Sequence, residues 1–93
     1  MKDIIEALIK FRNDRDWQKF HTPENLAKSI VIEAAELLEN FQWGMDFVNV
    51  ENVKEELADV MIYSLLLCER FGFNLEMIIQ EKIEKNRKKY PDK

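Results

Sequence analysis

The chain is poor in the residues that make tight turns and in those that make covalent cross-links. Its 93 residues include two glycines and two prolines, too few for the turns of a multi-stranded β fold. The one cysteine, Cys68, cannot form an internal disulfide, and its apolar run MIYSLLLC is typical of a small buried hydrophobe. No apolar run approaches the roughly 20 residues of a membrane span. These shortages favour a helical fold without disulfides or membrane spans.

The chain also lacks the excess of positive charge that nucleic-acid-binding surfaces use. Its formal net charge is −4 and its isoelectric point is near 5.0, which argues against nucleic acid as a partner. The first eleven residues, MKDIIEALIKF, are too charged for a signal peptide. We therefore expect a protein of the reducing cytoplasm that binds neither nucleic acid nor a membrane.

What the chain does contain is helix-forming sequence, rich in Glu, Lys, Leu, Ala, Met and Gln. It predicts one all-α domain over residues 1–93, with helices over about 3–15, 23–43, 50–71 and 75–89. Thr22 and Asn74 are predicted to cap helix starts, while Gly44 and Gly72 are predicted to end helices. Because so short a chain buries a modest share of its surface, we expect the apolar third helix to pack in a homodimer or homotetramer.

The second and third predicted helices are apolar nearly all round, and their few polar residues form one narrow ribbon on each. Glu33 and Glu36 lie one turn apart on the second helix, whereas Glu39 lies about 60° further round. Glu56 and Asp59 form the ribbon of the third helix. Consecutive helices joined by a short loop usually lie antiparallel, so facing ribbons would bring four carboxylates together.

Four carboxylates between leucines and isoleucines cannot all ionise without a cation. Hard divalent cations suit oxygen ligands, with Mg²⁺ favoured when a substrate supplies phosphate oxygens and Mn²⁺ as the alternative. The single histidine, His21, excludes a Glu-x-x-His di-iron pattern, and the single cysteine excludes a zinc cluster. The alternative interpretation is a solvated face, because glutamates three residues apart are common on charged helices.

The order E-x-x-E, nineteen intervening residues, E-x-x-D resembles the metal signature of the MazG-like all-α nucleoside triphosphate pyrophosphohydrolases. The resemblance is closest to the dCTP pyrophosphatase branch and runs from about Phe11 to Pro91. It is carried in order by RDWQKFHTPENLA, EAAELLENFQW, EELADVMIY and KIEKNRKKYP. The resemblance implies hydrolysis between the α- and β-phosphates. The magnesium ligands that it implies are Glu33, Glu36, Glu56 and Asp59.

The resemblance also implies a substrate site, with an aromatic base pocket and a basic C-terminal block near the phosphates. The residues implied to contact substrate are Trp17, Gln18, Lys19, Phe20, His21, Trp43, Tyr63, Lys82, Asn86 and Arg87. Leu8 stands where the animal dCTP enzymes carry a base-contacting histidine, so strict cytosine preference does not follow. The aromatic residues also fit a core or an interface, His21 fits a helix-start hydrogen bonder, and the basic block fits a solvated helix end.

Residues and resemblance together predict a Mg²⁺-dependent enzyme that converts a deoxynucleoside triphosphate, dCTP or a modified dCTP first, to monophosphate and pyrophosphate. Such an enzyme would sanitise the nucleotide pool. Glu36 is the candidate general base, with Glu33 as the second catalytic carboxylate. Two alternatives stay open: a phosphoribosyl-ATP pyrophosphatase-like enzyme, which shares the acid layout, and a non-catalytic helical interaction module. The RDWQKFH connector and FQW argue against the first, and the lack of an exposed heptad seam against the second.

Overall fold

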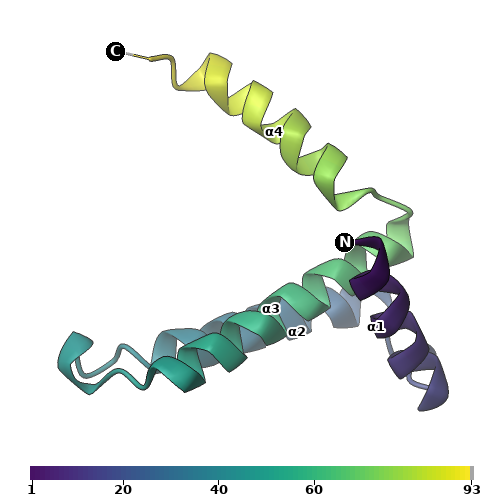
Figure 1. The fold of residues 1–93 in the computed structure, drawn as a ribbon, viewed down its shortest axis with the longest axis horizontal. Coiled ribbons are helices and arrows are strands. Elements are labelled where there is room, and N and C mark those ends of the chain that lie inside the picture. The colour runs from purple at the N-terminus through teal and green to yellow at the C-terminus, as the bar shows by residue number, and fades with distance from the viewer. Residues whose placement is uncertain (93) are drawn as a thin grey trace.

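The computed structural model describes residues 1–92, which form helices and no strand, so the all-α prediction is confirmed. These residues form four α-helices, which are labelled in Figure 1, and one short 3₁₀ turn. Their bounds are α1 Lys2–Asp14, α2 Pro23–Glu39, η1 Met45–Phe47, α3 Val50–Phe71 and α4 Leu75–Lys89.

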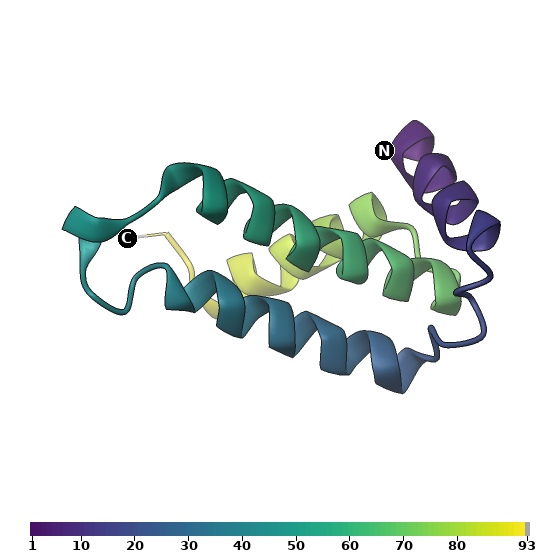
Figure 2. The ribbon, with the colours of Figure 1, turned by 90° about the horizontal axis from the view of Figure 1, so that it is seen from below.

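Helices α2 and α3 lie side by side and antiparallel, joined by the turn that contains η1 (Figure 2). Helix α1 packs against α3 at the end of this pair that is remote from η1 (Figure 1). The most buried apolar side chains lie at that same end: Leu26 of α2 is fully buried, and Leu65 and Leu66 of α3 are nearly so. The antiparallel pair is the arrangement that the two ribbons of acidic residues require.

The helix starts follow the capping residues in the sequence. The Thr22 hydroxyl accepts the Asn25 N–H at 3.2 Å, and Pro23 follows it at the first position of α2, where a missing N–H costs nothing. The Asn74 side chain accepts the Met77 N–H at 3.1 Å at the start of α4. Local sequence therefore fixes where these helices begin.

Helix α3 ends as predicted, but α2 ends four residues before the predicted Trp43. Gly72 has a left-handed backbone with φ of 72°, and the following residue donates its N–H to the Cys68 carbonyl at 2.9 Å. Residues 40–42 instead bond to carbonyls three residues back, so α2 tightens into 3₁₀-type turns that continue to Gly44. The chain stops at the predicted glycine, but not as regular α-helix.

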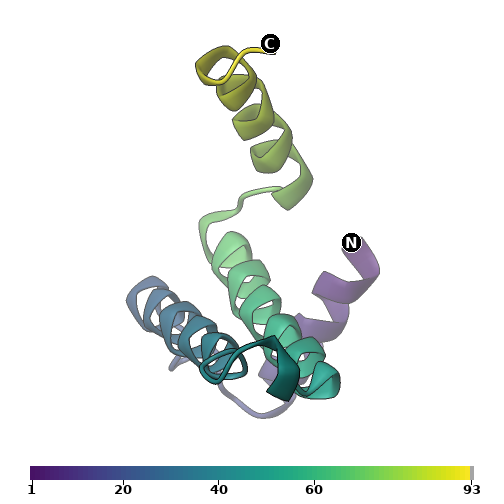
Figure 3. The same ribbon diagram turned by 90° about the vertical axis from the view of Figure 1, so that its left-hand side faces the viewer.

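Helix α4 extends away from the α2–α3 pair after the turn at Gly72 (Figures 1 and 3). Three of its apolar side chains are about half exposed: Met77, Ile79 and Ile83. Among the described residues, no helix has both the length and the apolar character that crossing a membrane requires.

Candidate active site

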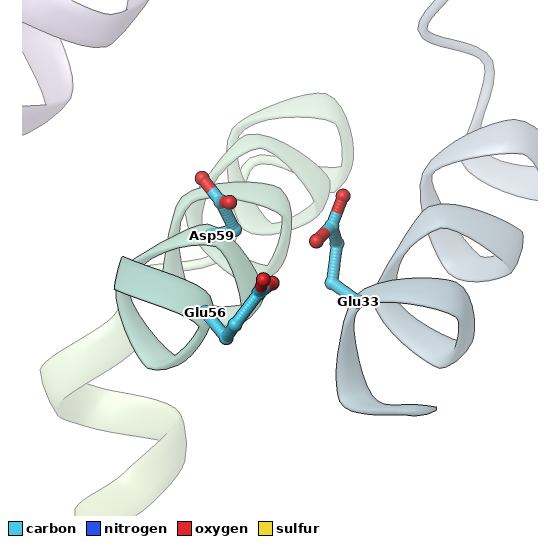
Figure 4. A group of neighbouring side chains, drawn as sticks. All are labelled: Glu33, Glu56 and Asp59. Carbon is cyan, nitrogen blue, oxygen red and sulfur yellow. The ribbon is translucent and has the colours of Figure 1, made fainter. Parts of the chain in front are cut away.

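Three carboxylates meet between α2 and α3. Glu33 comes from α2, and Glu56 and Asp59 come from α3; one oxygen of each lies within 4.8 Å of the others. Figure 4 shows the Glu33 side chain reaching from α2 toward the two acids of α3. We call Glu33, Glu56 and Asp59 the acid cluster. The one-turn spacing of Glu56 and Asp59 puts both on the α3 face that meets α2.

The acid cluster holds its negative charge at a cost. Desolvation, the neighbouring Glu36 side chain and the charges of Asp59 and Glu56 together raise the pKa of Glu33 to about 7. Desolvation and the charge of Glu36 likewise raise the pKa of Glu56. Glu33 Oε2 and Glu56 Oε2 are buried and accept no hydrogen bond from the described residues. Two unpartnered carboxylate oxygens beside a third acid can serve as ligands of a divalent cation.

Glu36, the fourth predicted ligand, lies beside the acid cluster without completing it. Its side chain is exposed, yet its negative charge helps to raise the pKa values of both Glu33 and Glu56. Glu39 is exposed and lies outside the acid cluster, as its place off the ribbon predicts. The α2 acids therefore divide into an inward Glu33, a neighbouring Glu36 and an outward Glu39.

A cavity of about 300 Å³ adjoins the acid cluster, and Asp59 belongs to both. We call it the aromatic cavity. Helix α1, the connector to α2, and α3 all contribute walls, while α2 itself contributes none. Its volume is at the low end of small-molecule sites. The lining residues are Leu8, Phe11, Arg12, Trp17, His21, Asp59, Ile62, Tyr63 and Leu66.

Aromatic side chains contact one another in sequence across this cavity. The ring centroids of Phe11 and Trp17 are 5.6 Å apart, those of Trp17 and His21 6.5 Å, and those of His21 and Tyr63 6.3 Å. Burial lowers the pKa of His21, and the charges of Arg12 and Arg70 lower it further. His21 Nδ1 is buried without a hydrogen-bond partner among the described residues. The neutral imidazole can thus bond a ligand that enters the cavity.

Tyr63 connects the aromatic cavity to the acid cluster. Burial raises the pKa of its phenol, and the negative charges of Glu33, Asp59 and Glu36 raise it further. The phenol therefore stays protonated at neutral pH and can donate a hydrogen bond to a ligand near the acids.

The other predicted substrate residues of the first half are not among those lining the cavity. Gln18 is half-buried and donates to Asp16 at 3.1 Å, while its Oε1 has no partner within residues 1–92. Lys19 pairs with the same Asp16 carboxylate at 3.0 Å. Phe20 and Trp43 are exposed, with Trp43 in the turn that follows α2.

The predicted phosphate-binding residues lie on α4, away from the α2–α3 pair in this chain (Figure 3). Lys82 is exposed, Asn86 is half-buried, and Arg87 pairs with Glu84 at 2.8 Å on the same helix. The described chain therefore does not bring this basic block to its own acid cluster.

Arg12 is the charged residue among the cavity residues that were not predicted from the sequence, the others being the apolar Phe11, Ile62 and Leu66. It lies one helical turn after Leu8 on the same face of α1, at a position where helical spacing calls for an apolar side chain. That charge on an apolar face was the available signal. Its partner Glu69 lies 57 residues away, beyond the reach of local patterns.

Comparisons with known proteins agree with this fold. The model of the MazG-like family matches residues 28–93, and the chain belongs to that family. The chain is 35% identical to dCTP pyrophosphatase 1 of Homo sapiens and of Mus musculus over an alignment of 100 residues, gaps included, that covers 98% of the chain. The alignment covers 59% of each relative, so the chain spans about three fifths of their length.

A solved structure shows the same fold over nearly its whole length. The crystal structure of a pyrophosphatase from Archaeoglobus fulgidus DSM 4304 matches with a TM-score of 0.94 and 44% sequence identity. The match covers 99% of this chain and 93% of that one. The MazG-like resemblance read from the four sequence blocks is thus confirmed.

Proposed function

We propose that this chain is a divalent-metal-dependent nucleoside triphosphate pyrophosphohydrolase, which cleaves between the α- and β-phosphates to release monophosphate and pyrophosphate. The observation that carries the proposal is the double role of Asp59, which belongs to the acid cluster and also lines the aromatic cavity. A nucleotide whose base enters the aromatic cavity would place its phosphates beside the carboxylates. The relatives are named dCTP pyrophosphatase 1 and pyrophosphatase, which supports the same reaction class.

The acid cluster fits a hard cation such as Mg²⁺, or Mn²⁺ in its place. Glu33 and Glu56 each hold a buried oxygen without a partner, and the raised pKa of Glu33, about 7, reflects a charge that a cation would neutralise. Glu33, Glu56 and Asp59 would hold the ion, with Glu36 as the fourth ligand. A bound divalent ion supplies neutralisation of phosphate charge and acidification of water.

The chain's own residues supply the remaining steps. Glu36 is exposed beside the acid cluster and accepts the proton of the attacking water, with Glu33 as the second carboxylate able to do so. The water oxygen bonds to the α-phosphorus as the bond from that phosphorus to the α–β bridging oxygen breaks, and pyrophosphate leaves with the bridging oxygen. The protonated phenol of Tyr63 donates to the substrate between base and phosphate.

The aromatic cavity suits a flat base. Trp17 offers a stacking surface, and neutral His21 offers a hydrogen-bonding edge with a free Nδ1. We propose dCTP or a modified dCTP as the first substrate to test. Leu8 contributes an apolar wall to the cavity, so the cytosine edge would be read by other groups. The cellular role would be sanitising nucleotides in the cytoplasm.

We further propose that the chain acts as a homodimer or homotetramer. Within residues 1–92, large apolar side chains stay exposed along α2 and α3, including Val31, Ile32, Leu38, Leu57 and Met61. Large apolar side chains left exposed on two neighbouring helices are typical of a protein interface. A second copy would cover these faces, and its α4 would bring Lys82, Asn86 and Arg87 to the phosphates.

Product analysis tests the proposed function. Purified protein is incubated with each of the eight common nucleoside triphosphates and a methylated dCTP, with Mg²⁺, with Mn²⁺ and with a chelator. The expected result is pyrophosphate and monophosphate in equal amounts, only with metal, and fastest with a dCTP. Orthophosphate as the first product would contradict the mechanism. A silent interaction module would release neither product.

A further inference from the structure

Arg12 is the one charged side chain that the described residues bury, with 7% of its surface exposed. It lies in α1 and lines the aromatic cavity. Its Nη1 donates to Glu69 Oε2 of α3 at 2.8 Å, and its Nε donates to Asn13 Oδ1 at 3.1 Å. The guanidinium is thus fixed in two directions, one along α1 and one across to α3.

The main chain of Arg12 holds a second part of the same wall. Its carbonyl accepts the N–H of Trp17 at 3.1 Å and that of Arg15 at 3.2 Å. Asp16, between them, has φ of 54°, the one positive φ outside glycine in the described chain. Such a left-handed residue is strained and needs surrounding bonds to hold it. The position of Trp17 therefore depends on Arg12, whose carbonyl accepts the hydrogen bonds that close the turn between them.

The Arg12–Glu69 ion pair links α1 to α3, two helices that line the aromatic cavity, and few other polar contacts link them in the described part of the chain. Phe11 and Trp17 line the cavity from α1 and the connector, and Ile62 and Tyr63 line it from α3. Within residues 1–92, the Arg12–Glu69 pair is the salt bridge that joins α1 to α3. A buried ion pair contributes little stability compared with apolar packing, because desolvation offsets the attraction. Its effect here is geometric: the fixed fork of arginine sets the spacing of the two walls.

We infer that Arg12, held by Glu69, is a positioning residue that sets the aromatic cavity for a nucleobase. The inference rests on the proposed function for the identity of the ligand. Arg12 acts through Trp17 and Phe11, and its loss weakens base binding more than turnover. The charge of Arg12 also helps to keep His21 neutral. Burial is the largest cause of the lowered pKa of that imidazole, and the charge of Arg12 lowers it further.

Binding of dCMP, followed by tryptophan fluorescence, isolates the base from the triphosphate. The variants are Arg12→Met, which keeps most of the buried volume, Glu69→Gln, which leaves Arg12 in place, and the double variant. The matched control is Lys10→Met with Asp14→Asn, which removes the exposed Lys10–Asp14 pair of the same helix. Binding is measured well below the lowest melting temperature, so that a change in Kd is not loss of fold.

Each single substitution should raise the Kd for dCMP about tenfold, and the double variant should bind no worse than either, because coupled residues are not additive. In pyrophosphate release, KM should rise about tenfold while kcat changes by less than about threefold, the pattern of lost binding alone. The control variant should match wild type in both.

Unchanged Kd in folded Arg12→Met or Glu69→Gln would overturn the inference, as would additive effects in the double variant. If Arg12→Met does not fold, Glu69→Gln alone decides. Wild type that binds dCMP but releases no pyrophosphate contradicts the proposed function and leaves the binding cycle to decide on Arg12. Wild type that releases pyrophosphate with no coupling between Arg12 and Glu69 contradicts the inference alone. Wild type that does not bind dCMP overturns the inference directly.

Discussion

The acid cluster and the aromatic cavity share Asp59, yet they are built in opposite ways. The acid cluster comes from two neighbouring helices. Its carboxylates repel one another, and two of its buried oxygens have no hydrogen-bond partner among the described residues. The aromatic cavity comes from α1, the connector and α3, and its one buried charge, Arg12, is paired with Glu69. Carboxylates without partners are suited to a cation that binds phosphates, whereas an apolar, aromatic cavity whose buried charge is paired is suited to holding a neutral base. Changes to the first should act on turnover and changes to the second on affinity.

The largest effect should come from the acid cluster. Glu56→Gln removes a charge from the three-carboxylate group, and we expect kcat for dCTP to fall about 10²–10³-fold, as loss of a transition-state electrostatic group does. Glu55→Gln, at the exposed neighbouring position on α3, is the matched control and should leave kcat unchanged. Equal rates for the two variants in a pyrophosphate-release assay would remove the acid cluster from the mechanism.

Removing a wall of the aromatic cavity should give the complementary result. Trp17→Ala deletes the ring that contacts Phe11 and His21, and we expect KM to rise about tenfold or more, since stacking on a base is worth about 1–3 kcal/mol. The kcat should change little. Exposed Phe20→Ala, three residues on, serves as comparison. A fall in kcat with unchanged KM would mean that the two regions do not divide the work.

Tyr63 lies where the two regions meet, so its substitution should touch both modestly. Tyr63→Phe keeps the ring against His21 and removes the phenol hydroxyl, whose pKa is raised by burial and by the nearby acids. We expect kcat/KM to fall about three- to tenfold, the usual worth of one hydrogen bond. Steady-state kinetics across dCTP concentrations measures this. No change at all would show that the phenol does not contact substrate.

The smallest effect should be on the stability of metal-free protein as pH changes. Glu33 has a pKa of about 7 when folded against an ordinary 4.5, so the folded state binds the extra proton between these values. Its stabilising contribution is full below about 4.5 and is lost as pH rises through about 7. His21, whose pKa is lowered by burial, acts in the opposite direction near 6.5.

Melting temperatures of wild type and Glu33→Gln in a chelator separate these contributions, because His21 is common to both. The quantity of interest is the difference in melting temperature between wild type and Glu33→Gln. Any advantage of wild type should shrink, or reverse in favour of Glu33→Gln, as pH rises. A difference independent of pH from 4.5 to 8 would show that Glu33 does not titrate in this window.

Much of the fold and the acid cluster could be predicted from sequence because short-range rules govern them. Thr22 with Pro23, Asn74 and Gly72 fix helix ends locally, and one-turn spacing puts Glu56 and Asp59 on one face. The antiparallel α2–α3 pair then follows from a short connection. Glu33 could be told from Glu39 by helical phase alone.

The rest depends on contacts that no local pattern encodes. Arg12 and Glu69 pair across 57 residues, and the path of the connector that seats Trp17 depends on the strained Asp16. The early end of α2 reflects a choice between α and 3₁₀ turns that differ little in energy. The amphipathic pattern of α4 does not predict the direction in which this helix leaves α3. The positions of Lys82 and Arg87 relative to the acids therefore could not be derived.

Titration of metal-free protein with Mn²⁺ by calorimetry near pH 7.5 tests the central claim most directly, because it measures the acid cluster without any substrate. Wild type should bind with release of a fraction of a proton, since Glu33, with a pKa of about 7, is still partly protonated at this pH and must be ionised to bind a cation. Glu56→Gln and Asp59→Asn should lose most of this affinity, and Glu55→Gln should keep it. Equal affinity in wild type and Glu56→Gln would contradict the account, because the metal would then bind elsewhere.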